Sequence, residues 1–159
     1  MDTDFQQVVN TYADGMYRLA YSFCANRADA EDVVQEVLIK YLQRPPRCNG
    51  PEQLRAWLMK ATANKCRDLL RSGWRRKTQP LAQPCAPPEA DDAALDVRAA
   101  LMQLPPGQRG AVYLYYYEQF TTRQIAETLH LSETAVRSRL FQARKTLKKL
   151  LGGDEDDGT

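Results

Sequence analysis

The feature that most limits the fold of this chain is a proline-rich stretch near its middle. Four prolines fall between residues 77 and 88, among Gln, Ala and few large apolar side chains. This composition predicts an extended linker rather than part of a packed core. The segments on either side have about 60–75 residues each, a size at which a domain is only marginally stable alone. We therefore expect two small domains, over residues 1–76 and 92–151, joined by a flexible linker over 77–91 and followed by an acidic disordered tail over 152–159.

Apolar residues recur at helical spacing on both sides of this linker. Large apolar side chains separated by three and four residues mark one face of a helix. The pattern predicts helices over residues 5–23, 29–43, 51–71, 92–104 and 107–118, with two more after residue 120. The run from Tyr113 to Tyr117 has the composition of a strand, but a strand needs partners and its surroundings are helical. The expected fold class is all-α.

The composition argues against most kinds of enzyme. The one histidine, His130, nearly excludes a Ser-His-Asp or Cys-His catalytic set and supplies a zinc site poorly. The four cysteines stand 18 or more residues apart, so neither a metal cluster nor a disulfide framework is indicated. Glycine-rich phosphate-binding loops are missing as well. We expect no catalytic residue, no metal, no cofactor and no small-molecule substrate.

The hydropathy of the chain and its first residues bear on its localisation. No apolar run approaches the roughly 18–20 residues that a membrane helix needs. Residues 1–5 show neither the basic nor the apolar part of a secretory signal. The expectation is a cytoplasmic protein without membrane insertion.

The net charge of +2 conceals a strong segregation of charge along the chain. Residues 55–77 hold eight basic side chains against Asp68 alone, and residues 133–149 hold six against Glu133 alone. The stretch between them, over residues 89–96, is acidic. Two basic segments indicate two contacts with a polyanion such as nucleic acid, although each could instead be a solvated helix face.

The strongest local signal is a predicted helix-turn-helix after residue 120. Thr121 and Gln124 have the spacing of a capping box, which opens a short helix. His130 and Leu131 form a tight turn, with Leu131 as its apolar plug, and Ser132 is the expected N-cap of a long helix over 133–151. Two helices joined by such a turn form a DNA-binding helix-turn-helix, or else a plain helical hairpin.

The long helix separates into an apolar face and a polar face. Phe141 lies on the polar face, where its ring is unfavourable in water but suits a thymine methyl in the major groove. Arg137, near the helix start, has the fork that reads guanine, and the cations further along suit phosphates. The residues expected to contact DNA are Thr134, Arg137, Ser138, Arg139, Phe141, Gln142, Arg144, Lys145 and Lys148.

The first domain carries two further polar stripes. The predicted helix over 51–71 has Lys60, Asn64, Arg67 and Arg71 on one face, where three cations flank one amide that could read a base. The preceding helix has an acidic and polar face, formed by Asp29, Asp32, Gln35 and Glu36. An acidic face repels DNA, so it is expected either to meet a protein or to be solvated.

Six short strings in this chain together resemble bacterial sigma factors. In chain order they are Asp29–Val37 (DAEDVVQEV), Leu54–Leu58 (LRAWL), Asn64, Leu104–Arg109 (LPPGQR), Gln124–Glu127 (QIAE) and Thr134–Arg139 (TAVRSR). Each string is weak alone, but their order and the linker between them are specific. The likeness is to the short extracytoplasmic-function group of the sigma-70 family, and it covers about residues 5–151.

The resemblance implies a subunit that binds core RNA polymerase and directs promoter-specific transcription initiation. By this likeness, the face with Asp32 and Glu36 would dock on the clamp helices of the largest polymerase subunit, and the flap would be a second polymerase contact. The stripe from Lys60 to Arg71, with the loop over 44–53, would melt the minus-ten element, and Asn64 would line a pocket for a flipped base. The helix-turn-helix would read the minus-thirty-five element. An anti-sigma factor is a further expected partner.

The chain departs from the family pattern at a few positions. His130 stands where the family often has glycine in the turn, and histidine tolerates a positive φ better than most residues. Gln142 stands where arginine is common, so it is expected to read adenine instead. Lys65 and Cys66 occupy positions that are often apolar or small, so the promoter helix is expected to pack differently.

Two other classes of helix-turn-helix protein make different demands on the sequence. A free-standing helix-turn-helix regulator would need a dimer interface to match two half-sites, and no long coiled-coil seam is visible. A recombinase would need an activated nucleophile in residues 1–76, where Ser22 and Ser72 have no activating neighbour in the sequence.

Overall fold

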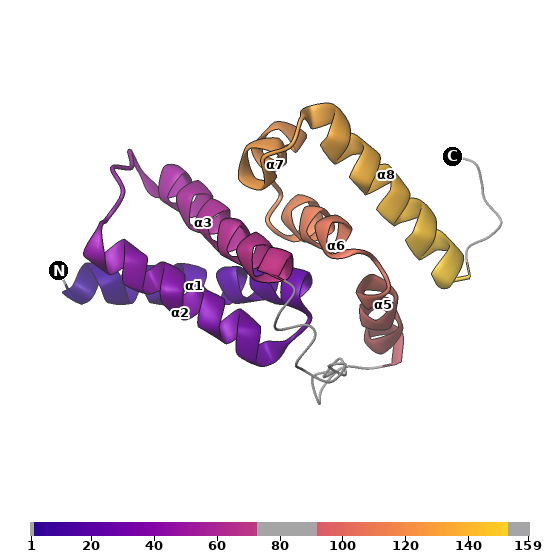
Figure 1. Ribbon diagram of the computed structural model, residues 1–159, viewed down its shortest axis with the longest axis horizontal. Coiled ribbons are helices and arrows are strands. Elements are labelled where there is room, and N and C mark those ends of the chain that lie inside the picture. Colours follow the sequence, from indigo (N-terminus) through magenta and orange to yellow (C-terminus); the bar gives the residue numbers. More distant parts are fainter. Residues whose placement is uncertain (1, 73–91, 153–159) are drawn as a thin grey trace.

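The computed structural model describes residues 2–72 and 92–152, with side chains over 5–72 and 97–152 (Figure 1). Its elements are α1 (Asp2–Cys24), α2 (Arg27–Gln43), α3 (Pro51–Ser72), α5 (Asp92–Met102), α6 (Pro106–Val112), the π-helix η1 (Tyr113–Tyr117), α7 (Thr122–Leu129) and α8 (Glu133–Leu150). Within these described ranges every regular element is a helix, which confirms the all-α fold class. The predicted linker and most of the predicted acidic tail lie outside the described residues.

Local chemistry explains where the first helices begin and end. The Asn26 side chain accepts a hydrogen bond from the Asp29 backbone N–H at 2.9 Å, so α2 begins at Arg27, two residues before the predicted start. The helix ends at Gln43, ahead of Pro45, because a residue before proline is pushed out of the helical region. Pro51 opens α3, where its missing N–H costs nothing.

The tyrosine-rich segment is helical, as predicted, but it is wound more widely than an α-helix. The Glu118 N–H bonds to the Tyr113 carbonyl five residues back, at 3.3 Å, and the Phe120 N–H bonds to the Leu114 carbonyl at 2.9 Å. The five-residue span of the Glu118 bond is that of the π-helix η1, which the expected single helix over 107–118 did not include, and the Phe120 bond spans six residues just beyond it. Gln119 follows with a φ of 60°, which turns the chain towards α7.

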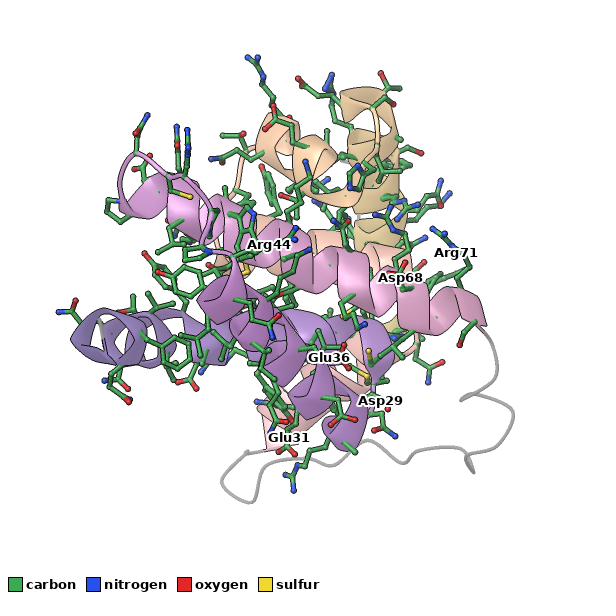
Figure 2. The ribbon with its side chains drawn as sticks, turned by 60° about the vertical axis from the view of Figure 1, so that its left-hand side comes forward. Asp29, Glu31, Glu36, Arg44, Asp68 and Arg71 are labelled. Carbon is green, nitrogen blue, oxygen red and sulfur yellow. The ribbon has the colours of Figure 1, made fainter. Side chains whose placement is uncertain are left out.

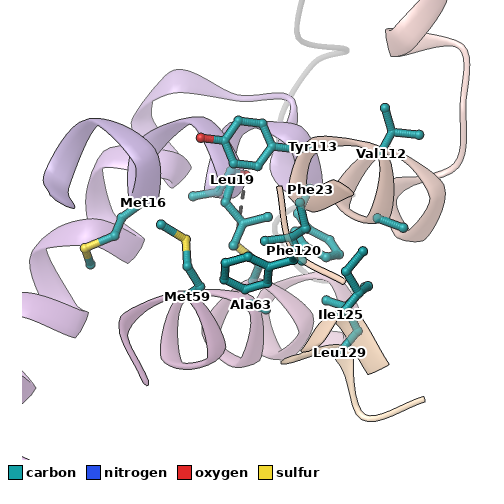
Figure 3. Packing of buried hydrophobic residues seen from close by; sticks show 14 of the residues in the cluster. Met16, Leu19, Phe23, Met59, Ala63, Val112, Tyr113, Phe120, Ile125 and Leu129 are labelled. Carbon is teal, nitrogen blue, oxygen red and sulfur yellow. Dashed lines mark hydrogen bonds between the residues drawn. The ribbon is translucent and has the colours of Figure 1, made fainter. Parts of the chain in front are cut away.

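The two halves of the chain share one hydrophobic core. Figure 3 shows Leu19, Phe23 and Met59 of the first half beside Tyr113 and Phe120 of the second. Contacts between α1 and α6 and between α3 and α7 join the halves. The described residues of the two predicted domains therefore pack against one another, while the division into domains and its bounds remain a prediction. Each half alone is too small to bury much apolar surface, and mutual packing adds to what both bury.

Two arginines connect the halves at the edges of this core. Arg109 of α6 is only 8% exposed, and its guanidinium donates to the carbonyls of Ser22, of Phe23 (2.9 Å) and of Leu104 (2.6 Å). Ser22 and Phe23 lie in the last turn of α1, so Arg109 of α6 supplies donors to the C-terminal turn of a helix in the other half. Arg55 of α3 pairs with Glu118 at 2.8 Å and forms a second polar link between the halves.

Glycine permits the closest approach along this seam. A Cβ on Gly110 would clash with the ring of Phe23, which is itself buried. Only the absence of a side chain lets α6 lie this near to α1.

Candidate nucleic-acid interface

The predicted helix-turn-helix is present, and its caps are those expected from the sequence. The Thr121 hydroxyl accepts from the Gln124 N–H at 3.0 Å, and the Gln124 side chain accepts from the Thr121 N–H at 2.8 Å. His130 has a φ of 59° and ends α7 in the left-handed conformation that the turn requires. The Ser132 hydroxyl then accepts from the Ala135 N–H at 3.0 Å and opens α8. The capping box and the N-cap are therefore confirmed.

The faces of α8 are also as predicted. Val136, Leu140 and Ala143 are buried against the rest of the domain. The side chain of Arg137 is 57% exposed and Phe141 is 58% exposed, so both point away from the core. Exposure of a phenylalanine beside an arginine leaves a mixed apolar and cationic surface, which suits the edges of bases in a major groove.

The other predicted DNA contacts on α8 fall into two groups. Thr134, Ser138, Gln142, Lys145 and Lys148 are exposed with Arg137 and Phe141. Arg139 is only partly exposed, because its guanidinium lies against the backbone of Gly107 at the start of α6. Arg139 therefore stands apart from the exposed surface, and the sequence periodicity carried no signal for this contact.

Arg144 is exposed and has partners in η1. Its Nε donates to the Tyr116 hydroxyl at 2.8 Å, and its guanidinium carbon lies 5.9 Å from the centre of the Tyr115 ring. Neither tyrosine was among the residues expected to act at the DNA site, since Tyr116 and Arg144 are separated by 28 positions.

The residues of the predicted promoter-melting stripe on α3 have two kinds of surroundings: two of them are exposed to solvent, and two contact the end of α7 and the turn that follows it. Lys60 and Arg71 are exposed, and Figure 2 shows Arg71 at the end of α3. Asn64 is half-buried: its Oδ1 accepts from Arg67 Nη2 at 2.7 Å and lies 3.0 Å from Nε2 of His130. Arg67 also donates from Nη1 to the Leu129 carbonyl at 3.4 Å. The expected base-reading amide thus faces the other half of the chain.

His130 is affected by the charges on α3. Desolvation at this contact, together with the positive charges of Arg67 and Lys60, lowers the pKa of His130 below its ordinary value. The neutral imidazole is favoured there, and Nε2 donates to Asn64 when that ring nitrogen carries the proton.

The acidic face of α2 is partly as predicted. Asp32, Gln35 and Glu36 are exposed, and Figure 2 shows Glu36 on the outer side of α2. Glu36 pairs with Lys65 of α3 at 2.6 Å, so the family departure at Lys65 adds a cation to this surface. Asp29 differs from the expectation, because it is buried in the first turn of α2.

Cys66, the other departure on α3, is a core residue. It is fully buried, and a hydrogen bond with Cys24 together with burial raises the pKa of its thiol. A protonated thiol of this size packs like a small apolar side chain. α3 therefore packs through this position against α1, where the Cys66 Sγ lies 3.9 Å from the Ala20 carbonyl.

The described side chains offer neither a metal cluster nor a membrane-spanning helix. Among residues 5–72 and 97–152, no three His, Cys, Asp or Glu side chains gather in a way that could hold a metal ion. None of the helices described is both long enough and apolar enough to cross a bilayer.

Comparisons with known proteins agree with this geometry. Residues 8–76 match the family model for sigma-70 region 2, and residues 94–147 match the model for sigma-70 region 4. The chain is 33% identical to the ECF RNA polymerase sigma factor SigE of Mycolicibacterium smegmatis, over 92% of this chain and 61% of that protein. It is 30% identical to the ECF RNA polymerase sigma factor SigM of Mycobacterium tuberculosis, over 93% of this chain and 77% of that one.

Solved structures show the same arrangement of helices. The sigma factor RpoE of Bartonella quintana, in complex with the anti-sigma factor NepR, superposes with a TM-score of 0.76 at 25% identity. The match covers 96% of this chain and 99% of that one. CnrH, in complex with the cytosolic domain of CnrY, has a TM-score of 0.68 at 26% identity, over 98% of this chain and 92% of that one.

Proposed function

Because the chain belongs to the extracytoplasmic-function group of the sigma-70 family, we propose that it binds core RNA polymerase and directs promoter-specific transcription initiation. The observation that carries this proposal is the completed helix-turn-helix whose exposed face presents Arg137 and Phe141. Members of this family recognise DNA and have no chemistry of their own, so no catalytic residue, cofactor or small-molecule substrate is assigned.

The exposed face of α8 is the proposed reader of the minus-thirty-five element. Arg137 lies in the first turns of α8, where a recognition helix meets base edges, and its fork matches guanine O6 and N7. Phe141, one turn further on, offers its ring to a thymine methyl. Gln142 could pair with adenine, while Lys145 and Lys148 suit phosphates.

The proposed minus-ten contact requires a change in the contact between α3 and α7. Both acceptor sites of the Asn64 amide oxygen have neighbours, in Arg67 and His130. For the Asn64 amide oxygen to meet a flipped base, its contact with the turn at His130 must open. Promoter melting by this chain therefore involves separation of its two halves, at least along this part of the seam.

Polymerase and anti-sigma contacts complete the proposal. The exposed side chains of Asp32, Gln35 and Glu36 on α2 are proposed to bind the clamp helices of the largest polymerase subunit. The second half of the chain is proposed to bind the flap. Binding to polymerase would place the chain in the cytoplasm. RpoE was solved with its anti-sigma factor NepR, and we propose that an anti-sigma factor also binds this chain.

Run-off transcription with core polymerase tests the function directly. Genomic fragments are transcribed with core polymerase alone, with the wild-type chain added, and with Arg137→Ala or Arg123→Ala added. Arg123 lies on α7 with its side chain 80% exposed, so it is a matched control. The expected result is discrete start sites that need the chain and that Arg137→Ala weakens but Arg123→Ala does not. Start sites that do not change when the chain is added would contradict the proposal.

A further inference from the structure

A tyrosine outside the helix-turn-helix holds one of the cations on α8. The Tyr116 hydroxyl accepts the Nε–H of Arg144 at 2.8 Å, and the Arg144 guanidinium lies over the Tyr115 ring at 5.9 Å. The two rings meet edge to face with centroids 4.9 Å apart. Arg144 thus has a hydrogen bond at Nε and an aromatic ring near its guanidinium carbon, and both partners come from η1.

The wide turn of η1 accounts for the position of Tyr116. In η1 the residues Tyr113 and Tyr117 stack with centroids 5.4 Å apart, and the Tyr113 hydroxyl bonds to Glu118 at 2.7 Å. Tyr113 is buried, so this stack fixes the helix from inside the core. Tyr116 is left 51% exposed on the side that meets α8. A π-turn is uncommon and often marks a functional place in a helix.

Arg144 belongs to the same ridge of α8 as the proposed base readers. Residues 137, 141, 144 and 148 are separated by four, three and four positions, which places them in one line along a helix. Arg137 and Phe141 on this line are exposed, and so is Arg144. The guanidinium that Tyr116 holds is therefore at the edge of the surface proposed to meet DNA.

The hydrogen bond to Tyr116 uses only Nε, so the terminal nitrogens of the Arg144 guanidinium can bind an anion. Nε donates to Tyr116, while Nη1 and Nη2 carry a parallel pair of N–H groups at the far end of the plane. A phosphate accepts two such bonds side by side. An arginine side chain loses considerable rotamer freedom when it is fixed, so holding it before binding lowers the entropic cost of the contact.

We propose that Tyr116 is a positioning residue for DNA binding, whose hydroxyl orients Arg144 towards a backbone phosphate. The inference rests on the proposed function, because it takes α8 as the helix that meets DNA. By this inference, Tyr116 of η1 contributes to the affinity of the chain for DNA. Since the contact is with phosphate, its effect is on affinity for any duplex rather than on the choice of sequence.

The test is a double-mutant cycle with the full chain and a fluorescent 30-bp duplex of random sequence. Binding is measured by anisotropy over a range of salt concentrations for wild type, Tyr116→Phe, Arg144→Ala and the double variant. Tyr117→Phe is the matched control, because it deletes a hydroxyl from the next residue, which is 70% exposed. Urea unfolding of each variant accompanies the titrations.

Tyr116→Phe is expected to weaken binding about two- to tenfold, the cost of ordering one long side chain. The slope of log K against log salt is expected to stay at its wild-type value, because the phosphate contact still forms. Arg144→Ala is expected to reduce that slope by about one. In the Arg144→Ala background, Tyr116→Phe is expected to have no further effect, and Tyr117→Phe is expected to bind as wild type.

Three results would overturn the inference. Equal losses from Tyr116→Phe with and without Arg144 would mean that the hydroxyl acts independently of the arginine. If Tyr116→Phe bound DNA as tightly as wild type while Arg144→Ala bound more weakly, α8 would still be a DNA-binding helix, but Tyr116 would have no positioning role. No binding to the duplex even at low salt would remove both. If the effects of Tyr116→Phe and Arg144→Ala were coupled as expected but the chain produced no new start sites with core polymerase, only the sigma-factor proposal would be contradicted.

Discussion

Replacement of Arg109 by methionine tests whether the two halves of the chain depend on one another. Methionine retains a flexible apolar chain about as long as the stem of the arginine, so the change removes mainly the guanidinium. The carbonyls of Ser22 and Phe23, at the end of α1, and of Leu104 then lose their donor in a place where Arg109 is 8% exposed. Backbone carbonyls without partners in such a place are costly.

The expected loss of stability is large for one substitution. A hydrogen bond to a charged group contributes about 1.5–3 kcal/mol, and an unsatisfied buried acceptor costs about 1–3 kcal/mol. The three bonds of one guanidinium are not additive, since the remaining groups relax together. We expect Arg109→Met to lower the free energy of unfolding by about 3–5 kcal/mol.

Urea unfolding followed at two probes measures this effect. The chain has two tryptophans, so a Trp74→Phe background leaves Trp57 of α3 as the only indole that reports on the first half. Far-UV circular dichroism reports on all helices. Because the core is shared, Trp57 fluorescence should shift to lower urea although the substitution is in α6, and both probes should follow one transition.

The control and the refuting outcomes are specific. Arg123→Met removes an exposed cation whose ion pair with Glu127 spans 4.0 Å, so it should change stability by less than about 0.5 kcal/mol. A loss below about 1 kcal/mol for Arg109→Met would show that water replaces the guanidinium at these carbonyls. A Trp57 transition unmoved by the substitution would show that the halves unfold independently.

Three further outcomes are expected. Gly110→Ala should destabilise the chain by about 1–3 kcal/mol in urea unfolding, because the added Cβ clashes with the buried ring of Phe23, and an unchanged midpoint would show that the ring moves freely. The pKa of His130 is lowered in the folded chain, so the neutral imidazole stabilises the fold above about pH 6.5, and this contribution is lost as the pH falls. The free energy of unfolding of the wild type should therefore fall more than that of His130→Asn between about pH 7.5 and 5.5. Parallel stability curves for the two proteins would contradict this. With holoenzyme and promoter variants, Arg137→Ala should cost about 1–3 kcal/mol of discrimination at one base pair, whereas Lys148→Ala should weaken binding evenly and flatten the salt slope; equal sequence-blind losses would remove Arg137 as a base reader.

Most of the local structure was predictable because its causes are local. The capping box at Thr121, the N-cap at Ser132 and the helix stop before Pro45 depend on residues within a few positions of one another. The outward faces of Arg137 and Phe141 followed from helical period alone. The sequence predicted a helix for the tyrosine-rich segment but not its π-helical winding. In the structure this winding occurs together with the stacking of buried Tyr113 on Tyr117.

The surroundings of three predicted site residues differ from those expected, and the differences have a common physical origin. Helical period places a residue on a side of its helix, but it does not say what lies against that side. Asp29 is on the expected face of α2 and yet is buried, and Arg139 lies on α8 but against Gly107 of α6. Asn64 has the expected position on α3, and its partner is 66 residues away in the turn at His130.

The amino-acid order alone determined the helices, their caps, the division of charge and the pattern of motifs that places this chain among the sigma factors. Only the tertiary structure decided that the halves share a core, that Arg109 closes α1 from the other half, and that Asn64 meets His130 rather than solvent. Capping and periodicity act over one or two turns of helix, whereas contacts between the halves depend on shapes that form only when helices distant in the chain pack together.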